Sequence, residues 1–185
     1  MANSLILAAG AIIALSAGSA AAQSATDTKS FAVTGNVPAL CSGGTIVGGG
    51  STFDLGVLID TTTGLLRTDL AAPPKVLSGS FCSSRSTISV AATPMTAQNF
   101  TAAPPAGFSR TVDYTATASG WTATAATFAT GSGSNPGASQ TRPSAFSGDI
   151  TVSIATFGTN GGSGLRLVSD TSYLGVVTVT LAVAN

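Results

Sequence analysis

Alternation of apolar and polar side chains over short stretches is the most regular feature of this sequence. The clearest cases are residues 111–118, 149–155 and 173–183. Successive side chains of an extended strand point to opposite faces, so each stretch predicts a strand with an apolar face. The first half of the stretch over residues 173–183 is largely apolar on both faces. Shorter strands are predicted over residues 41–47, 53–57, 76–82, 87–91 and 122–130.

Segments rich in glycine, serine and proline separate these predicted strands. They cover residues 48–51, 60–74, 94–107, 131–137 and 158–164. No apolar period of 3.6 residues is present beyond the first stretch of the chain, and 185 residues suffice for one core. Short strands between such turns predict a single all-β sandwich.

The first residues predict an export signal. An apolar run over residues 5–17 is followed by small residues, with Ala20 and Ala22 in the A-x-A pattern of a cleavage site. We therefore expect a signal peptide over residues 1–22, with cleavage after Ala22. The alternative, a buried or membrane helix, is disfavoured because the run is too short to span a bilayer comfortably. The mature chain is expected to lack a membrane span.

Export decides how the two cysteines, Cys41 and Cys82, are interpreted. An oxidising compartment favours a disulfide between them. Such a bond closes a loop of about 40 residues, for which chain entropy predicts roughly 4 kcal/mol of stabilisation. Two cysteines without any histidine fall short of a tetrahedral metal site, and their wide spacing is not that of a redox pair.

The charged residues exclude several function classes. Seven Lys and Arg balance seven Asp, and the chain has no His and no Glu. A neutral chain argues against nucleic acid or an anionic membrane as partner. Without the usual general bases we expect no enzyme and no cofactor. A Ser-Lys site would need Lys29 or Lys75, which we predict to lie in polar, poorly structured surroundings.

Two aromatic residues have alternative interpretations. Trp121 follows a predicted strand and is expected to belong to the core, as a lone tryptophan in a sandwich usually does. The alternative is a stacking platform for a sugar, next to the loop at residues 131–137. Tyr173 is expected to be a packing residue.

Residues 31–37 lie between the predicted cleavage site and Cys41. Phe31, Val33, Gly35 and Val37 form one row on one face of an extended segment. A strand there can pair within its own domain or with another copy of the chain.

The order of these features resembles the archaic chaperone-usher pilins, the family of secreted spore-coat-U-like domains. The similarity rests on residues 31–37 leading into Cys41, on Phe53-Asp54-Leu55-Gly56, on Ser78-Gly79-Ser80-Phe81-Cys82, and on the closing strand over residues 173–181. It covers nearly all of the mature chain.

The resemblance implies an immunoglobulin-like sandwich that lacks its last strand. Residues 23–38 would be a donor-strand extension, with Phe31, Val33, Gly35 and Val37 as its groove-filling positions, and residues 39–185 the pilin-like domain. The implied partners are a periplasmic chaperone, an outer-membrane usher and further copies of the chain, joined into a surface pilus that supports adhesion or biofilm formation. Two other hypotheses remain: a self-complemented coat or matrix protein, and a secreted carbohydrate-binding sandwich.

Overall fold

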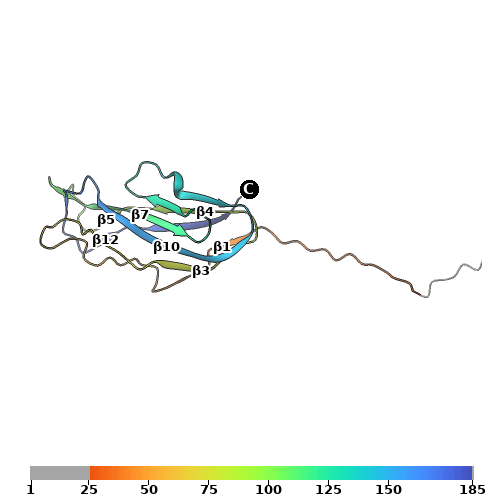
Figure 1. Ribbon diagram of the computed structural model, residues 1–185. Coiled ribbons are helices and arrows are strands. Elements are labelled where there is room, and N and C mark those ends of the chain that lie inside the picture. Colours follow the sequence, from red (N-terminus) through yellow and green to blue (C-terminus); the bar gives the residue numbers. More distant parts are fainter. Residues whose placement is uncertain (1–25, 185) are drawn as a thin grey trace, which may run out of the picture. The chain divides into compact units, whose positions relative to one another are not determined.

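The computed structural model describes residues 26–184. The signal peptide expected over residues 1–22 lies outside the described residues. By its internal contacts the chain divides into two units, residues 1–36 and residues 37–185. The strands of the described residues all belong to the second unit, and they form the predicted all-β sandwich (Figure 1).

The larger sheet contains eight strands of the described chain, paired antiparallel throughout. Its path runs through β1 (Cys41–Ser42), β3 (Lys75–Cys82), β10 (Phe146–Thr159), β7 (Thr111–Ser119), β5 (Met95–Ala97) and β12 (Tyr173–Leu174). Two further strands join from the side: β2 (Thr45–Val47) pairs with β3, and β8 (Ala126–Ala129) pairs with β7.

The second sheet has three antiparallel strands, with β4 (Ser86–Ala92) between β13 (Val177–Val183) and β9 (Ser139–Arg142). A short parallel pair joins β6 (Phe108–Ser109) to β11 (Arg166–Leu167), and one 3-10 turn, η1, covers Pro136–Ala138. The two main sheets share one apolar core, so the second unit is a two-layer sandwich.

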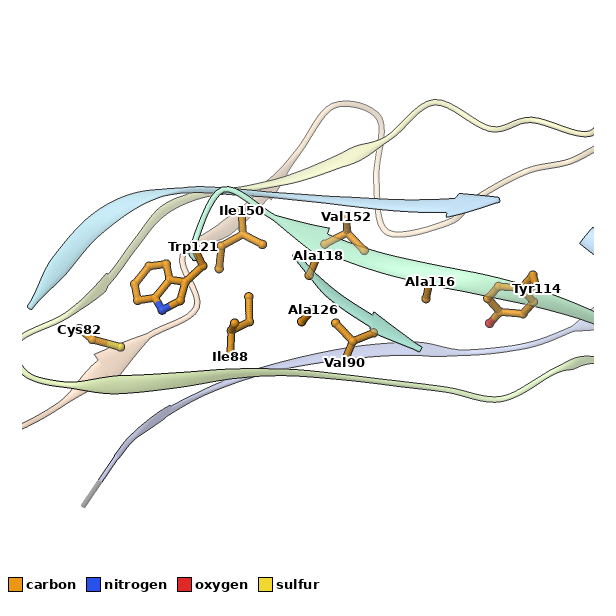
Figure 2. Packing of buried hydrophobic residues seen from close by; sticks show 10 residues of the cluster. All are labelled: Cys82, Ile88, Val90, Tyr114, Ala116, Ala118, Trp121, Ala126, Ile150 and Val152. Atoms are coloured by element: carbon orange, nitrogen blue, oxygen red, sulfur yellow. The ribbon is translucent and has the colours of Figure 1, made fainter. Parts of the chain in front are cut away.

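The core follows directly from the alternation in the sequence. Along β7 every second side chain, from Val112 to Ala118, is buried, and the intervening ones are partly exposed. Figure 2 shows Ile150 and Val152 of β10 pointing toward Ile88 and Val90 of β4 in the facing sheet. Many core positions are alanines, so the two layers can approach closely.

Trp121 lies in this core, as expected, with no exposed surface. Its indole Nε1 donates a hydrogen bond to Ser86 Oγ at 3.2 Å, and its ring meets Phe146 edge to face at 5.2 Å. The Arg142 guanidinium stacks over Phe146 and donates to the Trp121 carbonyl oxygen. A buried tryptophan cannot serve as a stacking platform for a sugar, so that alternative is wrong for Trp121.

The strand predicted over residues 173–183 is divided in two, and this prediction is corrected. β12 pairs with β5 of the larger sheet, whereas β13 pairs with β4 of the smaller one. The change of sheet occurs at Gly175 and Val176, where a Cβ on Gly175 would lie 2.7 Å from the Thr93 carbonyl oxygen. Hydrogen bonds in both directions between Val176 and Thr93 fix the crossing.

Most of the other predicted strands are confirmed, with shifted ends. Residues 53–57 form no strand, although Phe53 and Leu55 are half-buried, and the strand predicted over 122–130 shrinks to β8. β5 and β9 were not predicted, because strands of three and four residues are too short to show alternation. Tyr173 packs as expected, and its hydroxyl donates to the Val168 carbonyl oxygen at 2.7 Å.

Candidate functional site

An apolar groove opens between the two sheets of the second unit, beside β13. It has a volume of about 300 Å³. One wall is formed by β2 and β3, the other by the first half of β13. Its lining includes Ile46, Phe53, Lys75, Leu77, Val177 and Val179. The groove therefore exposes side chains that would be core residues if another strand covered them.

The edge of the second sheet at this groove is unpaired within the described residues. β13 pairs with β4 alone. Its inward side chains, Val177, Val179 and Leu181, pack against the core yet remain partly exposed. In an antiparallel ladder alternate backbone groups point away from the partner strand, so half of the β13 amides and carbonyls face the groove side. Such an edge can accept a further strand.

Lys75 lies at one end of this groove, at the first position of β3. The sequence predicted polar, poorly structured surroundings for it, and that prediction is wrong: the residue is only 9 % exposed. Its Nζ donates to the carbonyl oxygens of Gly49 at 3.0 Å and Gly48 at 3.4 Å. It also lies 5.9 Å from the centre of the Phe53 ring, a cation–π distance.

The glycine run next to β2 explains how these carbonyl oxygens reach the ammonium. Gly48 and Gly49 have φ values of +91° and +90°, in the region that side chains rarely adopt. The run therefore folds over Lys75 rather than forming only a break between strands. Within residues 26–184 Lys75 has no carboxylate partner.

The predicted donor strand carries exposed apolar side chains. Residues 26–40 contain no helix or strand. Phe31 is 86 % exposed, Val33 97 % and Val37 81 %, and a Cβ on Gly35 would meet only open space. A row of large apolar side chains at this exposure is costly in water unless a partner covers it.

The segment that follows this row is fixed to the sandwich by Ser83. Its hydroxyl donates to the Pro38 carbonyl oxygen and accepts from the Leu40 amide, and the Ser83 amide donates to the Leu40 carbonyl oxygen. Both backbone groups of Leu40 are therefore already bonded.

The predicted disulfide between Cys41 and Cys82 is confirmed. The two residues are direct register partners in β1 and β3, and Cys82 is buried in the core. Because β1 has only two residues, this bond holds the start of the sandwich onto the larger sheet.

Three carboxylates elsewhere in the second unit serve loop structure. The backbone N–H of Ser172, with those of Phe100 and Asn99, holds the pKa of Asp170 at about 2, below its ordinary 3.8. The backbone N–H of Thr63 lowers the pKa of Asp60 in the same way. Asp69 has a lowered pKa because it accepts hydrogen bonds from Arg67.

Two wider hollows lie among these loops, one lined by residues 57–69 and one by residues 52–59 and 167–173. Among the described residues no cluster of acidic or cysteine side chains could hold a metal ion. No helix in residues 26–184 is long and apolar enough to cross a membrane.

Sequence reasoning identified the disulfide and the apolar row, and the family resemblance implied an open groove, but the residues that line the groove were not identified. The groove combines Ile46, Lys75 and Val177, which are far apart along the chain. The first half of the strand predicted over residues 173–183 is largely apolar on both faces, which indicates a strand but does not reveal a groove. Comparison of the chain with protein-family models, with curated proteins and with solved structures finds no match.

Proposed function

We propose that this protein is a structural subunit of a cell-surface pilus or fimbria, assembled by strand addition between copies. The observation that carries the proposal is that one chain has both an uncovered apolar groove and an uncovered row of apolar side chains. One is the apolar groove beside the free edge of β13. The other is the exposed row of Phe31, Val33, Gly35 and Val37. The row of one copy would complete the sandwich of the next.

The two features match in length. β13 has seven residues, and so does the stretch from Phe31 to Val37. At about 3.3 Å per residue each spans roughly 23 Å. An added strand would pair its backbone with β13 and place alternate side chains in the groove. Because the donating and accepting surfaces differ, the contact does not close, and repetition gives a filament.

The family resemblance supports further parts of the proposal. In it the sandwich is immunoglobulin-like and incomplete, a periplasmic chaperone covers the groove before assembly, and an outer-membrane usher exports the polymer. The subunit then acts at the cell surface in adhesion or biofilm formation and has no catalytic role. The scarcity of charged residues, 8 % of the chain, suits a protein that associates through apolar strands.

The test is assembly in a periplasm, with the chain expressed together with a matching chaperone and usher. The full chain should give ladders of polymer that resist SDS and dissociate on heating. A chain lacking residues 23–37, or one carrying Val33→Asp, should give none, because a buried charge opposes insertion of the row. Val57→Asp, an exposed position outside both the row and the groove, is the control. A stable monomer that needs no chaperone would contradict the proposal and favour self-complementation.

A further inference from the structure

We infer that Lys75 sets the register of the incoming strand, by donating a hydrogen bond to its backbone at Gly35. This inference rests on the proposed function and names a specificity-determining residue of the groove. The occupant is residues 31–37 of a second copy. The argument has two parts: the unused hydrogen-bonding capacity of Lys75, and the missing side chain in the donor row.

A buried ammonium without a carboxylate is expensive. Lys75 is 9 % exposed, and within the described residues its hydrogen-bond acceptors are the Gly48 and Gly49 carbonyl oxygens, with the Phe53 ring 5.9 Å away. An ammonium has three N–H donors, so one remains for an acceptor placed in the groove. A leucine or methionine would line an apolar groove at lower cost, which indicates that the charge is kept for recognition.

Lys75 and Leu77 are alternate residues of β3 and line the same groove. A strand lying over them presents one member of its row to each. Phe31, Val33 or Val37 placed over Lys75 would cover the ammonium with hydrocarbon and leave its third N–H unsatisfied. Gly35 has no side chain there, so the backbone itself can approach and a carbonyl oxygen can accept the hydrogen bond.

This contact fixes the position of the whole row. With Gly35 over Lys75, a neighbour two residues away, Val33 or Val37, lies over Leu77. A shift by two residues would bring an apolar side chain onto the ammonium, and a shift by one would turn the apolar row out of the groove. Lys75 thus opposes the wrong registers as well as favouring the right one.

The experiment measures binding of a fluorescent peptide of residues 26–37 to the full mature chain carrying Val33→Asp, which disables its own extension. The acceptors are this chain and its Lys75→Met and Lys75→Ala versions. The donors are the native peptide and one with Gly35→Val. Lys29→Met in the acceptor is the matched control, since it removes a lysine that does not line the groove. Circular dichroism and an intact disulfide establish that each acceptor is folded.

We expect Lys75→Met to weaken binding of the native peptide at least about tenfold, as loss of a hydrogen bond from a charged donor predicts. Lys29→Met should leave it unchanged. The Gly35→Val peptide should bind the Lys75 acceptor at least tenfold more weakly than the native peptide does. Its affinity should be restored on the Lys75→Ala acceptor, because the smaller side chain leaves space for the valine. If the native peptide binds tightly and the Lys75 and Gly35 substitutions do not change the affinity as expected, the role of Lys75 is wrong but the strand-addition proposal stands. Failure of the native peptide to bind any folded acceptor would overturn the strand-addition proposal and this inference with it.

Discussion

At the scale of single residues, the stability of the core depends on a few polar atoms. Ser86 is fully buried, and its hydroxyl accepts the hydrogen bond from the Trp121 indole. Ser86→Ala leaves a buried N–H without a partner, so we expect a loss of about 1–3 kcal/mol in the free energy of unfolding. Ser89→Ala, on the opposite face of the same strand, should cost less than about 0.5 kcal/mol. Urea denaturation measures both, and equal losses would contradict this role of Ser86.

Asp170 gives a second test at this scale, through pH. Its pKa of about 2 is lower than the ordinary 3.8, chiefly because the ionised carboxylate accepts the Ser172 backbone N–H. A lowered pKa means that Asp170 adds stability above about pH 4, and that this contribution disappears as the pH falls toward 2. Asp170→Ala should therefore be less stable than the native chain at pH 7 and should lose less stability on acidification. Parallel acid profiles for the two proteins would contradict this assignment.

At the scale of elements, Gly175 allows the chain to pass from one sheet to the other. A Cβ there would lie 2.7 Å from the Thr93 carbonyl oxygen and 3.1 Å from the Met95 amide nitrogen, both of them backbone atoms. Gly175→Val should therefore destabilise the protein by about 1–3 kcal/mol, as overpacking does. Gly158→Ala, in open space with an ordinary φ, is the control and should change little. Thermal unfolding followed by circular dichroism distinguishes the two.

The same junction shows which elements the sequence can predict. Strands β4 and β7, and the middle of β10, were found because one face is buried there, so that apolar and polar residues alternate in the sequence. The alternation continues through Gly175 without interruption, so the change of sheet left no signal. Lys75 was misplaced for a related reason. A lysine after two prolines resembles a loop, and only the fold brings the Gly48 and Gly49 carbonyl oxygens to it.

At the scale of the molecule, the sandwich follows from the residue pattern, whereas an open side was implied only by the family resemblance and could not be located from the sequence. The strand count and the turn spacing indicate two sheets, whereas the groove depends on which strands become edges. That choice is made by contacts between distant residues, such as the pairing of β13 with β4. The apolar row of the extension could be recognised from the sequence, because its residues alternate within a short segment ahead of the sandwich. The groove could be located only in the structure, and the proposal depends on the row and the groove together.

The whole molecule also has an unusual titration behaviour. The chain contains no His and no Glu, and its two cysteines are joined in a disulfide. The described Asp residues with shifted pKa values are shifted downward from 3.8, and burial raises the pKa of Tyr114 and Tyr173 above 10. Between about pH 5 and pH 9 these Asp and Tyr side chains therefore keep the same protonation state when the protein unfolds.

Linkage then predicts a flat plateau, because stability changes with pH only where the folded and unfolded states bind different numbers of protons. Above pH 9 the raised tyrosine pKa values lower the stability. The two neutral tyrosines stabilise the folded state at lower pH, and this stabilisation is lost as the pH rises through their pKa values. We expect the free energy of unfolding to vary by less than about 0.5 kcal/mol from pH 5 to pH 9. Added salt should change little, since the ion pairs of the described residues are exposed. Urea denaturation at pH 5, 7 and 9, with and without salt, measures both effects. A steady slope across this range would mean that a titrating group couples to folding from outside the described sandwich.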